Sequence, residues 1–197
     1  KPWIVETVVS EIRPVIDYSS QMIVSMAAGV DADVLLGWLG TDRAGLSPKL
    51  LSVIPNTAIE IRRSMTFIWP VKADTGAVNI VEDLFASVGA TMVVNKRQLD
   101  AGMAMASCGI AYAMRYIHAS AEGGVELGLY PKDAIRIACE TVSGAAALLT
   151  AHGSHPESEI DKVTTPGGIT IKGLNEMEHS GFTSAVIKGL KASVSHS

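Results

Sequence analysis

The sequence predicts an α/β domain over residues 1–95 followed by an all-helical domain over residues 96–197. Before residue 96, short apolar runs typical of strands alternate with helical patterns, which is the order expected of a parallel α/β layer. After it, strand patterns stop and long helical segments rich in alanine and glycine follow. Apolar residues make up 48% of the chain and charged residues 18%, a composition that excludes a disordered protein.

The elements of the first domain are predicted from apolar periodicity and from residues that end or cap helices. Pro14 ends the first helix, and Asp31 is expected to cap a second helix that reaches Leu39. Pro55-Asn56 ends the second strand. The predicted strands cover residues 21–27, 49–54, 64–69 and 90–94, and the predicted helices cover residues 4–12, 31–39 and 75–88.

Prolines mark the starts of helices in the second domain. Pro131 stands at a favourable first position of a helix that reaches about Ala151. Pro156 and Pro166 are expected to begin two shorter helices. The remaining helices are predicted over residues 99–122, with a break near residues 108–109, and from about residue 183.

The second half of the 131–151 helix has no charged face. Residues 141–149 read Thr-Val-Ser-Gly-Ala-Ala-Ala-Leu-Leu. A helix that is apolar all round is buried on every side, and about 100 residues of helices do not easily enclose one of their own. We therefore expect a second copy of the chain to cover it, in a homodimer or higher homo-oligomer. The alternative is the central helix of a monomeric bundle.

Charge and composition argue against several other partners. The net charge of −4 disfavours a nucleic-acid partner. No uninterrupted apolar run approaches the roughly 20 residues that span a bilayer, so no membrane is expected. Two cysteines and no secretory signal predict a cytoplasmic protein. His152 and His155 lie near acidic residues, but their spacing is not a recognised zinc pattern, so no metal is expected.

The most specific local pattern is Thr165-Pro166-Gly167-Gly168, with Thr170 shortly after it. Thr165 is expected to cap a helix whose first turn contains Pro166 and both glycines. Each glycine costs roughly 1 kcal/mol in a helix relative to alanine, yet glycines let an anion reach the free N–H groups at the positive end of the helix dipole. The pattern therefore predicts a carboxylate site. The alternative is a tight corner against another backbone.

Small residues follow the first predicted strand, at Ala27-Ala28-Gly29. In an open α/β sheet, ligands bind beyond the carboxyl ends of strands, and small residues there admit a flat ring or a ribose. Pro55-Asn56 follows the next strand and is expected to line the same crevice. The alternative for Asn56 is a helix cap.

Together these segments resemble the pyrroline-5-carboxylate reductase family. Val163 to Ile171, with its Thr-Pro-Gly-Gly-Ile-Thr run, is the specific part, and the similarity runs along essentially the whole chain. The supporting segments are Lys1-Pro2, Ala27-Ala28-Gly29-Val30, Pro55-Asn56-Thr57, Gly109 with Ala111-Tyr112, Gly123-Gly124-Val125, Gly128-Leu129, His155-Pro156 and Gly181-Phe182.

The resemblance implies a truncated Rossmann-like α/β domain over residues 1–95 and an all-helical dimerisation and substrate-binding domain over residues 96–197. It implies an oxidoreductase of proline biosynthesis that reduces 1-pyrroline-5-carboxylate to L-proline with NADPH or NADH. The family's G-x-G-x-x-G turn, which cradles the cofactor pyrophosphate, does not occur in this sequence. We therefore expect a chain that begins part-way through the nucleotide domain and has little or no activity alone.

The resemblance also implies roles for individual residues. The Thr170 hydroxyl would hydrogen-bond the ring nitrogen of the substrate; it is too weak an acid to be the ultimate proton source, so it would polarise, orient or relay. The implied substrate-binding residues are Val163, Thr165, Gly167, Gly168 and Thr170, and the implied cofactor-binding residues are Lys1, Pro2, Ala27, Ala28 and Asn56.

One segment departs from the family pattern, and two other functions stay open. The family's Ser-Gly-Ser-Gly-Pro-Ala-Tyr reads Ala-Ser-Cys-Gly-Ile-Ala-Tyr at residues 106–112, so no substrate contact is transferred to Ser107, Cys108 or Ile110. A related hydroxyacid-type dehydrogenase would need a lysine for acid–base chemistry, for which Lys162 and Lys172 are the candidates. The chain would otherwise serve as a dimerisation module without activity of its own.

Overall fold

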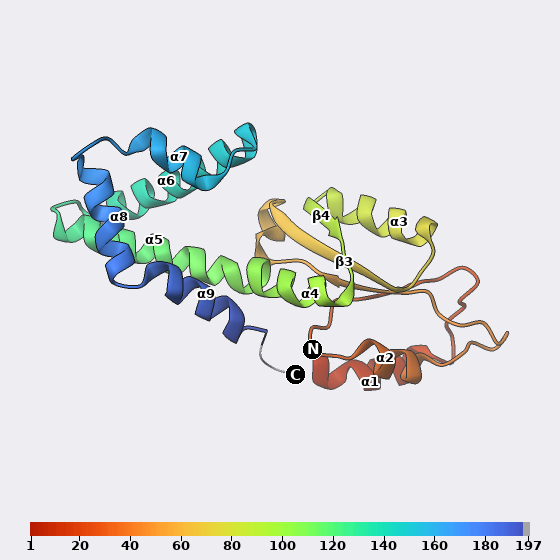
Figure 1. Ribbon diagram of the computed structural model, residues 1–197. Helices are drawn as coiled ribbons and strands as arrows, with labels where there is room; N and C mark the ends of the chain where they lie inside the picture. Colours follow the sequence, from red (N-terminus) through yellow and green to blue (C-terminus); the bar gives the residue numbers. More distant parts are fainter. Residues whose placement is uncertain (195–197) are drawn as a thin grey trace. The chain divides into compact units, whose positions relative to one another are not determined.

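The computed structural model describes residues 1–194, which form two compact units (Figure 1). The first unit spans Lys1–Ile110 and the second begins at Ala111. This division lies inside an uninterrupted helical segment over residues 96–126. The boundary suggested by the sequence, between residues 95 and 96, marks the start of that segment and stays a prediction.

The first unit contains a four-stranded sheet. Its strands are β1 (Ile23–Ser25), β2 (Leu50–Ile54), β3 (Ser64–Lys72) and β4 (Gly89–Val93), in the spatial order β1-β2-β3-β4. Its helical elements are η1 (Pro2–Ile4), α1 (Val5–Ile12), α2 (Ala32–Leu39), η2 (Thr57–Ile61), α3 (Thr75–Ala86), α4 (Lys96–Gly102) and the π-helix η3 (Met103–Cys108). The predicted strands and helices of this unit are all present, although β1 is shorter than expected.

The sheet is mixed, which corrects the expectation of a parallel layer. β1 runs parallel to β2 and β3 runs parallel to β4, but β2 and β3 are antiparallel, with Ile54 opposite Phe67. The link between β2 and β3, residues 55–63, carries only the short η2. A parallel return needs a crossover of about a dozen residues or more, so this link allows only an antiparallel neighbour.

Apolar clusters on the two faces of the sheet hold the first unit together. Leu50 and Leu51 are neighbours in β2 and therefore point to opposite faces. Figure 1 shows α3 on one side of the sheet and α1 and α2 on the other. The cluster under α3 contains Leu51, Val53, Ile68, Ala77, Val81 and Phe85, and the cluster under α1 and α2 contains Val9, Tyr18, Leu35, Leu39 and Leu50.

The second unit is helical as far as it is described. It contains most of α5 (Gly109–Glu126), then α6 (Pro131–His152), α7 (Pro156–Val163), α8 (Ile169–His179) and α9 (Phe182–Ala192). Near residues 108–109, where the sequence predicts a break, the helix is continuous and changes from the π-helix η3, which ends at Cys108, to α5, which begins at Gly109. The starts predicted at Pro131 and Pro156 are confirmed.

Most of α6 is not covered by any other part of residues 1–194. Only Ala134 and Ala138 of this helix are buried, and Leu148 is 50% exposed. By length and composition, α6 is also the one helix within residues 1–194 that could cross a membrane. The sequence prediction of a helix that needs an external apolar surface is therefore consistent with the structure of the single chain.

Candidate functional site

The Thr165–Gly168 segment forms a β-turn. The Gly168 N–H donates to the Thr165 carbonyl at 2.9 Å, and Gly167 has a φ of +72°. Proline in the second position and a left-handed glycine in the third are typical of a type II turn. The predicted cap at Thr165 and helix start at Pro166 are therefore wrong: α8 begins at Ile169, with Gly168 as its N-cap.

Both glycines are explained by the turn itself. Gly167 adopts a backbone conformation that side chains disfavour. A Cβ on Gly168 would lie 2.5 Å from Thr165 Oγ1 and 3.0 Å from the Thr165 carbonyl oxygen. This supports the tight-corner alternative for the glycines. The anion-binding argument moves to the start of α8, whose first N–H groups, from Ile169 onward, have no carbonyl partner inside the helix.

Thr170 is the second residue of α8, beside these N–H groups. In the middle of a helix a threonine hydroxyl can bond to the carbonyl four residues back, as Thr141 and Thr150 do in α6 at 2.8 and 3.0 Å. For Thr170 that residue is Pro166, which lies in the turn and outside the helix. The hydroxyl and the free N–H groups are thus available to a ligand at the same end of α8.

The predicted substrate-binding residues lie along one short stretch of chain. Val163 ends α7 and is 63% exposed. Thr164 follows it, and its hydroxyl donates to the Ile160 carbonyl at 3.1 Å. The turn and α8 come next, with Thr165 and Thr170 both exposed. The structure therefore brings these residues together on an accessible surface, while their role in substrate binding stays a prediction.

Three of the predicted cofactor-binding residues share one edge of the sheet. Ala27 and Ala28 follow β1, and Asn56 follows β2. Because β1 and β2 are parallel, their carboxyl ends lie at the same edge. Gly29, with a φ of +83°, has no atom within 4 Å of where a Cβ would stand. The loop after β1 therefore borders open space.

The other two predicted cofactor-binding residues lie at the start of the chain. Pro2 begins η1, and the Lys1 Nζ stands 6.0 Å from the centre of the Trp3 ring. Both residues are exposed. In the part of the chain that is described, no hydrogen bond or ion pair joins either residue to Ala27, Ala28 or Asn56.

Asn56 acts as a cap, as its alternative interpretation proposed. Its Oδ1 accepts from the Ala58 N–H at 3.1 Å, and its Nδ2 donates to the Ala106 carbonyl in η3 at 3.4 Å. The Ser107 hydroxyl donates to the Pro55 carbonyl at 3.5 Å. Sequence reasoning missed this link, because apolar periodicity does not distinguish a π-helix from an α-helix. Such irregular turns are frequent at functional sites.

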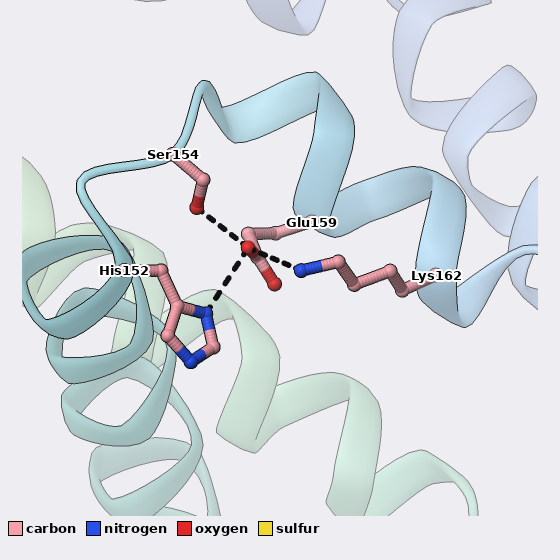
Figure 2. Close-up of polar contacts among 4 residues, drawn as sticks. All are labelled: His152, Ser154, Glu159 and Lys162. Atoms are coloured by element: carbon pink, nitrogen blue, oxygen red, sulfur yellow. Dashed lines mark hydrogen bonds and ion pairs between the residues drawn. The ribbon is translucent and has the colours of Figure 1, made fainter.

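A second polar cluster joins the end of α6 to α7 (Figure 2). Glu159 Oε1 accepts from Lys162 Nζ at 2.7 Å and from Ser154 Oγ at 2.5 Å, and it lies 3.2 Å from His152 Nδ1. The hydrogen bond from Lys162, followed by that from Ser154, lowers the pKa of Glu159 to about 2. Within residues 1–194, no group of three or more His, Cys, Asp or Glu side chains is arranged to hold a metal.

Comparisons with known proteins agree with this architecture. A family model described as pyrroline-5-carboxylate reductase dimerisation matches residues 96–197. Pyrroline-5-carboxylate reductases 1 and 2 of Dictyostelium discoideum are 39% and 38% identical over 88% and 89% of this chain. The chain spans only 33% and 62% of the lengths of these two relatives.

A solved structure shows the same fold. The crystal structure of Plasmodium falciparum pyrroline carboxylate reductase with NADP bound matches 98% of this chain and 75% of its own with a TM-score of 0.87, at 24% identity. The predicted Rossmann-like α/β region followed by a helical dimerisation region is thereby confirmed. Because the dimerisation model matches more than half of the 197 residues, the chain belongs to the pyrroline-5-carboxylate reductase family.

Proposed function

We propose that this protein is an oxidoreductase of proline biosynthesis that reduces 1-pyrroline-5-carboxylate to L-proline, as a homodimer in the cytoplasm. One observation carries the proposal. The family's most specific segment forms a turn that leads directly into α8, where the Thr170 hydroxyl and the free N–H groups lie together. A substrate with a carboxylate next to a ring nitrogen matches that pair of groups.

The start of α8 supplies the carboxylate site. Its unpaired N–H groups, from Ile169 onward, carry roughly half a positive charge through the helix dipole, so a carboxylate binds there without an arginine. Thr170 would donate its hydroxyl proton to the ring nitrogen, or relay a proton to it, as the C=N bond is reduced. The turn at Thr165–Gly168 holds these groups in one place and forms the wall of the site.

The sheet edge fits the nicotinamide end of NADPH or NADH. Ala27 and Ala28 are small, and the space beside Gly29 is open, so a flat ring can approach the loop. The cofactor supplies the hydride. The sequence contains no G-x-G-x-x-G turn for the pyrophosphate, so we expect this chain alone to bind NADPH weakly and to turn over little substrate. Calorimetry with a dissociation constant in the low micromolar range would contradict this expectation.

Apolar surfaces of the second unit support a homodimer. A groove of about 670 Å³ lies among residues of α5, α8 and α9, and Tyr112, Tyr116 and Phe182 are among its lining residues. The uncharged part of α6, residues 141–151, would extend over about 16 Å, roughly half the thickness of a bilayer core. A protein surface therefore suits α6 better than lipid. We propose that a second copy covers both surfaces and buries well over about 2,000 Å².

The hydroxyacid alternative has two candidate lysines, Lys162 and Lys172. The Lys162 ammonium bonds to Glu159 at 2.7 Å, which weakens the case for this lysine and leaves Lys172 as the other candidate. The alternative of a dimerisation module without activity is supported by the absence of a pyrophosphate-binding turn from the sequence. Measurements of substrate turnover and of ligand binding distinguish this module from an enzyme.

The purified chain is assayed in two reactions. One contains 1-pyrroline-5-carboxylate and NADPH, and the other contains a set of small 2-hydroxyacids and the oxidised cofactor. We expect L-proline to form from the imine, slowly, and no turnover of the hydroxyacids. Binding of L-proline is measured in parallel by calorimetry. Turnover of a hydroxyacid but not of the imine would refute the proposal. Dimerisation with neither turnover nor L-proline binding would favour the inactive module.

A further inference from the structure

Helix α7 is held by polar contacts more than by apolar packing. None of its residues, Pro156–Val163, is buried, and Ile160 is only half-buried. A surface helix is normally fixed by an apolar face against a core. Yet α7 is followed, after Thr164 alone, by the turn that begins at Thr165. The position of α7 therefore sets the position of the turn and of the start of α8.

Glu159 makes the contacts that fix α7. Its carboxylate accepts hydrogen bonds from Ser154 Oγ in the α6–α7 link and from Lys162 Nζ in α7. It also lies 3.2 Å from Nδ1 of His152, the last residue of α6 (Figure 2). The bond from Lys162 lies within α7 and leaves the helix free to move. The contacts with His152 and Ser154 join α7 to the preceding elements.

The surroundings of Glu159 make these contacts stronger than those of an ordinary surface ion pair. The side chain of Glu159 is 15% exposed, whereas those of His152 and Lys162 are 49% and 60% exposed. An isolated exposed ion pair contributes little to stability, but a network on one shielded carboxylate is held more firmly. Hydrogen bonds to an ionised group are also about twice as strong as neutral ones.

We propose that Glu159 is a positioning residue for the substrate turn. By holding α7 to the end of α6, its carboxylate fixes Thr164, whose hydroxyl bonds back to the Ile160 carbonyl, and through Thr164 the turn and the first N–H groups of α8. This inference rests on the proposed function, because it assigns Glu159 to the same substrate site.

The test compares Glu159→Gln with Glu157→Gln. Both carboxylates lie in the first turn of α7, so both substitutions lose the same favourable interaction with the helix dipole. Within residues 1–194, however, the Glu157 carboxylate has no hydrogen bond or ion pair. Glu157→Gln is therefore a matched control for charge, side chain and helix position.

Two readouts are needed. Hydrogen–deuterium exchange measures the Gly168 amide, which donates to the Thr165 carbonyl in the turn, and we expect it to exchange at least about tenfold faster in Glu159→Gln than in Glu157→Gln. Steady-state kinetics are measured with the imine substrate. We expect KM to rise about tenfold and kcat to change by less than about threefold, because the substitution weakens binding of the substrate in its ground state. A merely structural weakening would lower the fraction of folded enzyme and leave KM unchanged.

Equal exchange at the turn in the two variants would overturn the inference, as would faster exchange with an unchanged KM. If the parent chain neither converts the imine nor binds L-proline, the proposed function fails, and the exchange comparison alone decides whether Glu159 fixes the turn. Should Glu159→Gln give no soluble protein, Ser154→Ala is compared with Ser158→Ala in the same two assays. Ser154→Ala removes one donor, keeps the charge of Glu159 and should act in the same direction.

Discussion

The two units of the chain differ in what their apolar side chains contact. In the sheet unit, Leu50, Leu51, Val53 and Ile68 have no exposed surface. In the helical unit, over residues 111–194, the buried apolar residues are three alanines, Ala121, Ala134 and Ala138. Large side chains of that unit are open to solvent, with Leu127 at 88% and Ile169 at 88%.

This difference indicates that the two units are stabilised in different ways. The sheet unit buries branched side chains against its own helices, in clusters that form within a single copy. Large apolar side chains gathered on an exposed surface are typical of interaction sites, and the groove among α5, α8 and α9 is lined by such side chains. The proposed substrate site belongs to the helical unit, so its integrity is expected to depend on assembly, whereas the sheet unit should remain folded without it.

The largest effect is expected from a charge on α6. Ala146→Glu places a carboxylate on the exposed apolar part of the helix, where a second copy would bury it without a partner at a cost of about 3–5 kcal/mol. We expect insoluble protein and not a clean monomer. Light scattering and solubility measurements check this, with Ser158→Glu on the polar α7 as the control. A soluble dimer with Glu at position 146 would show that a second copy does not bury this part of α6.

A core substitution in the sheet unit should act without affecting assembly. Leu51→Ala removes a fully buried side chain and is expected to lower the free energy of unfolding by about 2–5 kcal/mol. Denaturant unfolding measures the loss, and light scattering should report an unchanged dimer. Ile80→Ala, at a position that is 60% exposed, is the matched control and should change stability by less than about 0.5 kcal/mol. Dissociation of the dimer by Leu51→Ala would show that the units are not independent.

Thr170→Val tests whether the Thr170 hydroxyl, at the exposed start of α8, takes part in catalysis. In an active form of the enzyme, loss of a donor that acts in the transition state is expected to lower kcat by about 30- to 1000-fold, or about 2–4 kcal/mol. Valine keeps the shape, so stability and cofactor binding should hardly change. Thr141→Val removes a hydroxyl that bonds inside α6 and is the control. A decrease in kcat of less than about threefold would assign the role to another group.

The smallest effect is expected from acid. The pKa of Glu159 is about 2, below its ordinary value of 4.5, so the unfolded chain binds a proton at this residue more readily than the folded chain does. Its contribution to stability is therefore complete above about pH 4.5 and is lost as pH falls towards 2. Between these values, unfolding of the helical unit should depend less on pH in Glu159→Gln than in Glu157→Gln. Identical pH profiles would contradict the contacts of Glu159.

Signals that lie close together in the sequence predicted much of the fold. Asp31 caps α2 as expected, accepting from the Asp33 and Val34 N–H groups at 2.9 and 3.4 Å. Pro131 begins α6 at the predicted residue. Such boundaries depend on a few neighbouring residues, so a single sequence contains the information for them.

Other features depend on contacts or on ambiguous signals. The direction of β3 follows from its pairing with β2, and β1 is limited to the three residues that pair with β2. Pro166 is equally favourable at a helix start and in a β-turn, and only the left-handed backbone of Gly167 decides between them. Glu157 and Glu159 look equivalent in the sequence, and only the fold brings His152 and Ser154 to one of them.

The open surface of α6 gives the two units different kinetics during synthesis. The sheet unit can close its core as soon as its own residues have left the ribosome, in a first-order step. The proposed covering of α6 by a second copy would require an encounter between two chains, so its rate would increase with the concentration of chains. Until that encounter, the apolar surface of α6 stays exposed in each new chain, with Leu148 half exposed. High local concentration, as on a single messenger RNA, therefore favours correct pairing over aggregation with unrelated nascent chains.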